Sequence, residues 1–302
     1  MLALLTSSTD PGVELKEAPV PEPLPNQAVV AVKAISLNRG EVRALDGKAP
    51  GNLHGWDFAG TVERPAADGT GPQHGARVVG FATTAWAQRV AVPTRDLAVL
   101  PAEVSFEQAA ATPVSGMTAL QGLRDKGHVE KGQRVLVFGA GGGIGHMIVQ
   151  LARGYGATVT GVARPAKLDF VRSLGADTDV AGPYDLIMDT AGNRPIREMR
   201  PLLTRTGTLV IVGGEGGKGR FLGGFERSLS TYAIGPFVPQ HVQSLISLPK
   251  LADLEALAGF LADGTLRPVI DRTFGLPEAP DAIRYLNSGE PRGKVVIAVA
   301  SA

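Results

Sequence analysis

The segment that most constrains this chain is a glycine-rich stretch between an apolar run and a helical pattern. The run Arg134–Gly139, RVLVFG, is continuously apolar after its first residue, as in a parallel strand buried on both faces. The sequence AGGGIG follows, and the amphipathic pattern after it ends at Gly156. Glycines let backbone N–H groups approach a pyrophosphate closely, and a helix N-terminus favours the anion. The pattern therefore predicts a dinucleotide-binding strand–loop–helix unit.

The expected cofactor-binding loop consists of Ala140, Gly141, Gly142, Gly143 and Ile144. The strict G-x-G-x-x-G spacing falls on Ala140, Gly142 and Gly145, so alanine takes the place of the first glycine. The alternative is a glycine-rich turn that binds nothing. The strand before the loop, the helix after it and a second strand at the proper distance favour binding.

The surrounding pattern extends this unit into a doubly wound α/β sheet. Further strands are expected at 157–163, 184–192 and 207–214, with helices at 165–176 and 194–205. The first 110 residues or so read instead as short strands broken by Gly and Pro, such as Ala28–Leu37. Helical patterns begin near Ser105, with Gln108 completing a capping box, and recur at about Pro249–Asp263 and Pro277–Ser288, before a last strand at 294–299.

The end of the second sheet strand predicts which dinucleotide binds. An NAD site usually places Asp or Glu there, whereas this strand is followed by Arg164 and Lys167, with no carboxylate before Asp169. Arg164 can grip a 2′-phosphate through its planar guanidinium, and Lys167 can add a second positive charge. We therefore expect NADPH as the cofactor. The alternative is that both side chains are solvated surface charges.

The composition of the chain excludes several kinds of site and of binding partner. The chain has no cysteine, which excludes disulfides, thiolate nucleophiles and sulfur-ligated zinc, and fits a reducing, cytoplasmic setting. A net charge of +1 gives no overall attraction to nucleic acid. The N-terminus reads as a strand rather than a signal peptide, and no stretch predicts a membrane span. We expect neither nucleic acid nor membrane as a partner.

With its glycine loop and several further segments, the chain resembles the medium-chain dehydrogenase/reductase superfamily. Within that superfamily it is most similar to the zinc-free, zeta-crystallin-like quinone oxidoreductase branch. The resemblance covers nearly the whole chain. It rests on SLNRGEVRALDG (36–47), GWDFAGTV (55–62), GARVVGF (75–81), AWAQRVAVP (85–93), TPVSGMTAL (112–120), VQLAR (149–153), AKLDFVRSLGAD (166–177), YDLIMDTAGN (184–193) and RGKVVIAV (292–299). It implies a GroES-like substrate domain at 1–112 and 244–302 and a Rossmann domain at 113–243.

The same resemblance implies further site residues. Asn38 and Thr118 should lie near the nicotinamide as the catalytic positions. The remaining implied cofactor contacts are Ala191, Gly192, Asn193, Gly213, Gly214, Arg292 and Lys294. The alternative for Asn38 is a residue that stabilises a turn. For Asp57, we favour a structural carboxylate that accepts backbone N–H bonds over a catalytic role.

The chain departs from its zinc-dependent relatives where those carry their catalytic metal ligands. A Cys near the LN segment and a His-Glu pair are replaced here by Leu37-Asn38 and Trp56-Asp57. Without a metal there is no Lewis acid to hold an alkoxide, which disfavours alcohol dehydrogenation. The expected reaction is zinc-independent hydride transfer from NADPH to a quinone.

Two other activities stay open. One is an NADPH-dependent alkenal, enone or enoyl-thioester reductase, and the other, of a different class, is a non-catalytic NADPH-binding sensor or regulatory protein. The expected partner is a small-molecule electron acceptor. By resemblance the protein should also form a homodimer, for which part of Gly219–Gly235 could offer a sheet edge.

Overall fold

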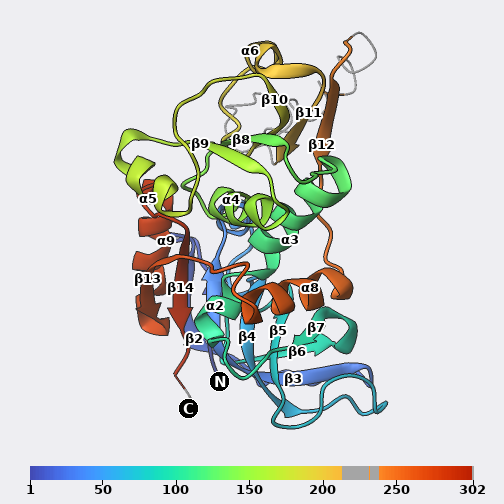
Figure 1. The fold of residues 1–302 in the computed structure, drawn as a ribbon. Coiled ribbons are helices and arrows are strands. Elements are labelled where there is room, and N and C mark those ends of the chain that lie inside the picture. Colours follow the sequence, from blue (N-terminus) through green and yellow to red (C-terminus); the bar gives the residue numbers. More distant parts are fainter. Residues whose placement is uncertain (213–230, 232–237, 301–302) are drawn as a thin grey trace. The chain divides into compact units, whose positions relative to one another are not determined.

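The protein folds into two compact units in a computed structural model that describes residues 1–212, 231 and 238–300. Unit 1 comprises Met1–Met117 and Pro249–Ala302, and unit 2 comprises Thr118–Leu248. Figure 1 shows the elements of both. Each unit has its own sheet and its own core, and each is described by itself below.

Unit 2 contains a five-stranded sheet in which every pairing is parallel. Its strands are β8 (Arg134–Phe138), β9 (Thr158–Val162), β10 (Tyr184–Asp189), β11 (Leu203–Val212) and β12 (His241–Leu245), in the spatial order β12-β11-β10-β8-β9. The central strands β8 and β10 are almost wholly buried, as their apolar runs require. The predicted Rossmann-type sheet is confirmed.

The connections in unit 2 are shorter helices than the sequence pattern indicates. They include α4 (Gly145–Gly154), which packs on β8 and β9, and a 3₁₀ turn, η3 (Pro165–Lys167), that leads into α5 (Leu168–Ser173). The helix expected at 194–205 is wrong beyond residue 202. There α6 (Ile196–Met199) and η4 (Arg200–Leu202) end, and β11 begins, because Leu203 and the chain after it pair with β10.

One strand of a fully doubly wound sheet is reduced to a single bridge. Thr160 of β9 pairs in parallel with Asp177, and no strand forms around this bridge within the described residues. The Gly161 N–H donates to the Asp177 carbonyl at 2.7 Å, and the Asp177 N–H donates to Val159 at 2.9 Å. Beyond β9, the sheet therefore continues through a single bridged residue, Asp177.

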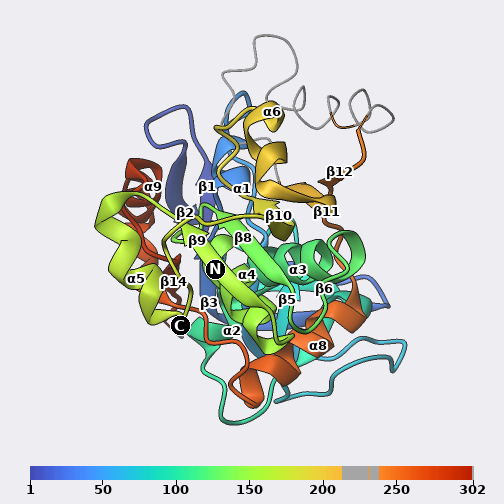
Figure 2. The same cartoon turned by 45° about the horizontal axis from the view of Figure 1, so that its top comes forward.

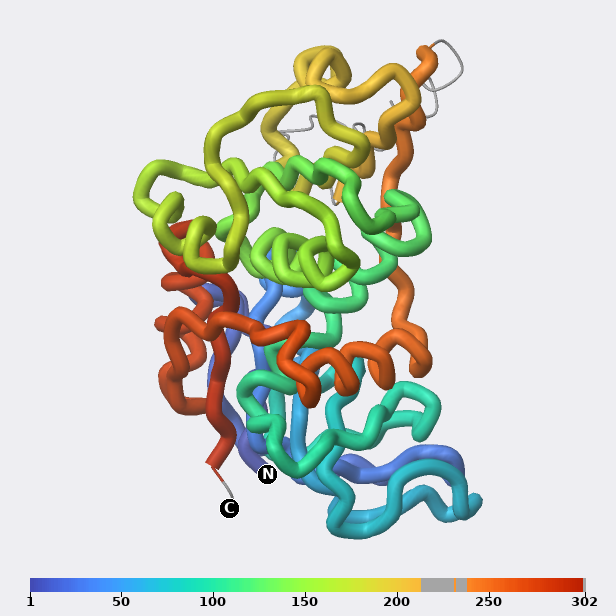
Figure 3. The backbone as a smooth tube through the Cα atoms, in the orientation of Figure 1, coloured from blue at the N-terminus to red at the C-terminus, as the bar shows by residue number. Residues whose placement is uncertain are grey.

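Unit 1 is built on a second, mostly antiparallel sheet. Its strands are β3 (Gln27–Leu37), β4 (Asp57–Arg64), β5 (Arg77–Phe81), β6 (Arg89–Pro93), β7 (Leu97–Val99), β13 (Ile270–Gly275) and β14 (Lys294–Ala298). The order is β13-β14-β3-β4-β5-β7, with β6 also pairing β3, and a separate hairpin joins β1 (Leu2–Thr6) to β2 (Val13–Glu17). Figure 3 shows the red C-terminal strand beside the blue β3.

Unit 1 contains the helices α1 (Arg39–Arg43), α2 (Phe106–Ala110), α8 (Leu251–Ala262) and α9 (Ala279–Ser288). Three of them pack on strands of this sheet, α2 on β3 and β4, α8 on β7 and α9 on β14, and α1 packs against α9. The Ser105 hydroxyl accepts from the Gln108 N–H at 3.1 Å, so the Ser105 half of the predicted capping box is confirmed. Figure 2 shows these elements from a second side. Helix α3 (Pro113–Gln121) begins in unit 1 and continues into unit 2, where a π-helical turn, η2 (Gly122–Lys126), follows.

Candidate cofactor and catalytic site

The glycine loop turns directly out of the buried strand β8. Gly139 has a positive φ of 81°, which a side chain would disfavour. Its N–H and that of Ala140 both donate to the Val162 carbonyl, at 2.9 and 3.1 Å, which ties the turn to the end of β9. A Cβ at Gly139 would lie 2.5 Å from the Thr190 hydroxyl. Only glycine fits at this position.

Beyond the turn, the loop presents unbonded backbone donors. In the part of the chain that the structure describes, the N–H groups of Gly141, Gly143 and Ile144 form no hydrogen bond. They stand at the N-terminus of α4, where donors and the helix dipole favour an anion. At Gly142 an added Cβ would meet one atom within 4 Å, the Gly139 carbonyl oxygen, in a tight contact of 3.3 Å. These residues fit the pyrophosphate of a dinucleotide.

The two predicted phosphate-binding cations lie just after β9. Arg164 is exposed at the start of η3, whereas Lys167 is only 9% exposed. The Lys167 stem packs over the loop, since a Cβ at Gly141 would be 3.0 Å from its Cδ. The nearest carboxylate in sequence, Asp169, pairs with Arg172 at 2.9 Å. Two cations therefore follow this strand before the first carboxylate in the sequence.

The other predicted cofactor residues are placed as follows. The N–H groups of Ala191 and Gly192 donate to Asp189 at 3.1 and 3.2 Å, which fixes the turn after β10. Asn193 is exposed, and Thr118 lies buried on α3. Arg292 is exposed and lies 3.6 Å from Asp271, while Gly213 and Gly214 fall outside the described residues. Contact of these residues with a cofactor stays a prediction.

Unit 1 holds Asn38 and Lys294 in a buried polar cluster. Asn38 precedes α1, and its amide nitrogen donates to Asp57 at 2.8 Å and to Glu41 at 3.3 Å. Its amide oxygen accepts from Lys294 at 2.5 Å and from Ser115 at 3.3 Å. An amide has two donors and two acceptor positions, so all four are used inside the protein. Asn38 and Lys294 are therefore hydrogen-bonded to each other inside unit 1.

Burial shifts the pKa of every ionisable group of this cluster. It raises the pKa of Glu41 well above its ordinary value, and the nearby charge of Asp57 raises it further. Burial likewise raises the pKa of Asp57, although Lys294 opposes the change. The pKa of Lys294 is lowered by burial, which outweighs the attraction of Asp57 and Glu41. The cluster therefore resists holding three separate charges at once.

The structural role predicted for Asp57 is confirmed. One of its carboxylate oxygens accepts the Val114 N–H at 3.0 Å, and the other accepts from Ser36 at 3.1 Å and from Asn38. Glu41 was not singled out from the sequence, although Asn38 followed three residues later by Glu41 matches the capping-box spacing. Its carboxylate accepts the Asn38 N–H at 2.7 Å and the Trp56 N–H at 2.8 Å.

A lysine–histidine contact adjoins this cluster. The Lys48 ammonium lies 2.8 Å from His54 Nδ1, and His54 Nε2 lies 2.9 Å from the Glu41 carbonyl. Since lysine can only donate, Nδ1 accepts and Nε2 carries the hydrogen. Burial lowers the pKa of His54, and Lys48 lowers it further. His54 is therefore held in its neutral form and is no source of protons at neutral pH.

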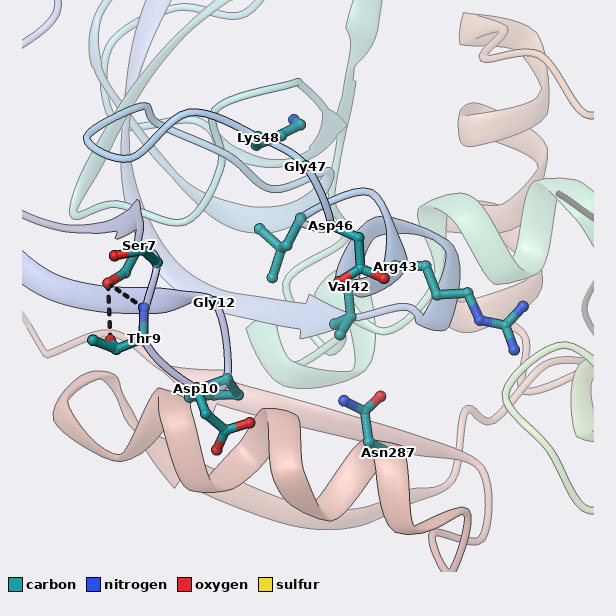
Figure 4. A pocket seen from close by; sticks show the side chains of 13 residues that line it. Ser7, Thr9, Asp10, Gly12, Val42, Arg43, Asp46, Gly47, Lys48 and Asn287 are labelled. Atoms are coloured by element: carbon teal, nitrogen blue, oxygen red, sulfur yellow. Dashed lines mark hydrogen bonds between the residues drawn. The ribbon is translucent and has the colours of Figure 1, made fainter.

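Lys48 also lines a surface pocket of about 430 Å³ in unit 1, shown in Figure 4. The wall comes from the β1–β2 turn, the end of α1 with the segment after it, and Asn287 of α9. Ser7, Thr9, Asp10 and Asp46 make its lining polar. Such a lining does not suit the apolar ring of a quinone.

Residues 1–212, 231 and 238–300 contain neither a cluster of metal ligands nor a helix fit to cross a bilayer. In those ranges no three His, Asp or Glu side chains gather as ligands for a metal ion. Likewise, no helix of the described chain is long and apolar enough to span a bilayer.

Comparisons with known proteins identify related sequences and structures. Residues 159–297 match the family described as zinc-binding dehydrogenase. The chain is 29% identical to the chloroplast envelope quinone oxidoreductase homolog of Arabidopsis thaliana, over 95% of this chain and 94% of that protein. It is also 29% identical to the 2-methylene-furan-3-one reductase of Solanum lycopersicum, over 92% of this chain and 73% of that protein.

A polyketide synthase protein of Streptomyces orinoci, NorB, is 32% identical over 96% of this chain, which spans only 14% of its length. Among solved structures, the quinone oxidoreductase from Coxiella burnetii superposes with a TM-score of 0.86 at 28% identity, covering 99% of both chains. These relatives agree with the fold of both units.

Proposed function

Since this chain belongs to the medium-chain dehydrogenase/reductase superfamily, we propose that it transfers hydride from NADPH to a quinone without zinc. Membership makes it an oxidoreductase whose fold implies a nicotinamide cofactor. The observation that supports binding most directly is the set of unbonded N–H groups at Gly141, Gly143 and Ile144. Bound there, the cofactor would supply the hydride.

The proposed preference for NADPH rests on the charge after β9. Arg164 is an exposed side chain, and its guanidinium can form a bidentate bond with a 2′-phosphate. Lys167 adds a positive charge beside the loop. An aspartate in the same place would repel that phosphate and favour NADH.

The proposed independence from zinc rests on the donor set. No cysteine is present, and by the family resemblance Leu37-Asn38 and Trp56-Asp57 stand where zinc-dependent relatives carry metal ligands. Both side chains already bond to neighbours within unit 1. A quinone suits such a site, because its reduced oxygens can take protons from water and need no dedicated acid.

We propose that Asn38 and Thr118 lie beside the nicotinamide. Thr118 would contribute its hydroxyl to the nicotinamide. Asn38 would contribute a side chain of fixed orientation, because its amide already makes four hydrogen bonds within the protein. Their contribution to rate is orientation of the cofactor and acceptor. We also propose that the protein works as a homodimer, although most of the predicted Gly219–Gly235 edge lies outside the described residues.

The test is turnover with purified protein. NADPH oxidation should be measured with a panel of quinones and simple enones, with and without a strong zinc chelator, and NADH should be run in parallel. We expect quinone reduction that the chelator does not change, with NADPH preferred over NADH. Loss of activity with the chelator, restored by zinc, would refute zinc independence.

A second candidate is enone reduction, which the similarity to the tomato reductase favours. Faster turnover of enones than of quinones would select it. Binding of NADPH without turnover of any acceptor would select the sensor or regulatory role instead.

A further inference from the structure

The buried cluster of unit 1 joins side chains that are far apart in the sequence. None is more than 8% exposed, and they come from β3, α1, β4, α3 and β14. The members are Ser36, Asn38, Glu41, Asp57, Ser115 and Lys294. A buried polar network is stable only when its members satisfy one another, so the loss of one member affects them all.

Lys294 is the cation of this network. Its ammonium donates to Asn38 Oδ1 at 2.5 Å and to Ser115 at 3.1 Å, and it lies 3.8 Å from Asp57. Lys294 itself is 2% exposed. A lysine buried to this extent needs a counter-charge and full hydrogen bonding, and the three oxygens supply them.

The Lys294 bond also fixes which way the Asn38 amide faces. Two carboxylates lie on one side of the amide, and the lysine and Ser115 lie on the other. A flipped amide would direct its NH₂ at an ammonium and its oxygen at carboxylates. Such a flip replaces attraction with repulsion at both ends, so the observed orientation is the only satisfied one.

The same network holds the first turn of α3. Asp57 accepts the Val114 N–H at 3.0 Å, which is one of the donors that a helix N-terminus leaves unbonded. Ser115, the next residue, bonds to both Lys294 and Asn38. Thr118 follows on this helix one turn later. The cluster therefore sets the start of the helix that carries a proposed nicotinamide neighbour.

We propose that Lys294 is a positioning residue, which holds the Asn38 amide and the first turn of α3 in the arrangement that hydride transfer requires. This inference rests on the proposed function. Lys294 need not touch cofactor or acceptor; it acts through Asn38 and Ser115. A small displacement of an orienting group lowers the rate strongly, by as much as about 100-fold for a shift of about 1 Å.

The test compares Lys294→Met with the charge-neutral double variant Asp57→Asn/Lys294→Met. The single variant leaves Asp57 without its cation, so we expect a lower Tm and a kcat that falls about 10- to 100-fold. The Kd for NADPH should change less than about 3-fold, because the proposed role of Lys294 is to orient groups for hydride transfer and not to bind the cofactor. The double variant should recover part of the Tm, because it removes the unpaired charge of Asp57 but also one of the two oxygens that accept from Ser36, Asn38 and Val114. It should not recover kcat, because Asn38 still lacks its donor.

Lys16→Met is the matched control, since Lys16 is an exposed lysine of unit 1 that pairs with Glu14 at 2.7 Å on the protein surface. It should change neither Tm nor kcat. Recovery of kcat together with Tm in the double variant would make Lys294 a counter-charge only and overturn the proposal. A single variant with wild-type kcat would also overturn it.

Hydrogen exchange separates this inference from the proposed function. In Lys294→Met the Val114 amide should exchange at least about 10-fold faster than in the wild type, whether or not a quinone is the acceptor. If the wild type reduces no acceptor while Val114 responds in this way, the proposed function fails and the anchoring of α3 stands. If Val114 exchange is unchanged, the anchoring itself is wrong.

Discussion

The glycine loop has two roles, since it packs tightly at the end of β8 and we propose that it binds NADPH. Replacement of Gly145 by alanine should disturb the packing, whereas replacement of Gly142 should disturb the binding. A Cβ at Gly145 would lie 2.1 Å from the Gly139 carbonyl oxygen and 2.8 Å from the Ala140 Cα. Both are backbone atoms, so the loop must shift as a whole. At Gly142 the added carbon would meet only the Gly139 oxygen within 4 Å, at 3.3 Å, and it would stand on the loop that we propose binds the pyrophosphate.

The magnitudes follow from these distances. Overpacking costs typically 1–3 kcal/mol, and the backbone contacts of Gly145→Ala place it near about 3 kcal/mol, or a fall in Tm of roughly 6–12 °C. In Gly142→Ala, a gain of about 0.4–1 kcal/mol from the stiffer unfolded chain offsets a tight contact. Its Tm should stay within about 4 °C of wild type. Its affinity for NADPH should fall by about 10-fold or more, or at least about 1.4 kcal/mol.

Thermal unfolding with and without NADPH measures both effects. For the wild type, ligand at about 100 times Kd should add roughly 2.7 kcal/mol of stability. Gly145→Ala should melt early without ligand, and Gly142→Ala should melt normally but gain less from NADPH. A Gly142→Ala protein that binds NADPH like the wild type would falsify the assignment of this space to the pyrophosphate. Wild-type melting of Gly145→Ala would refute the packing argument.

Three further predictions concern single positions. Arg164→Glu should lower the ratio of kcat/KM for NADPH to that for NADH by about 10- to 100-fold, because a carboxylate would repel the 2′-phosphate; an unchanged ratio contradicts the phosphate assignment. Because burial lowers the pKa of His54 from 6.5, the stability from its neutral ring is complete above that pH and is lost as the pH falls through the folded-state pKa. The Tm of wild type should therefore fall more between pH 7.5 and about 5 than that of His54→Gln, and parallel curves would contradict this. Gly259→Ala, at an exposed position inside α8 with no atom within 4 Å of its Cβ, should raise stability to urea by about 0.5–1 kcal/mol, and a loss would show that the helix packs differently there.

The local pattern was enough to predict the cofactor-binding unit, because strand, loop and helix are consecutive in the chain. The apolar run before Gly139 and the amphipathic pattern after the loop are each visible in a short window. The start of β11 could not be found in this way. Leu203 belongs to a helical pattern by its neighbours, and its strand conformation comes from pairing with Tyr184 of β10. Long-range pairing outweighed local propensity.

The buried cluster was harder to predict for a related reason. Asn38 and Asp57 were noted individually, and Lys294 was expected to touch the cofactor by resemblance alone. The hydrogen bond between Asn38 and Lys294 joins residues 256 positions apart, and no periodicity links them. Glu41 carried a local signal in its capping-box spacing, but that pattern does not reveal that Asp57 lies close by.

The pairing of β14 with β3 has a consequence for the order in which the protein can fold. β14 lies between β3 and β13, so the sheet of unit 1 lacks an internal strand until residues 294–298 have left the ribosome. All of unit 2 is synthesised before then. We therefore expect unit 2 to fold first, and the charged side chains of Asp57 and Glu41 to stay in water until Lys294 arrives. The last strand then supplies both the missing backbone partner and the cation.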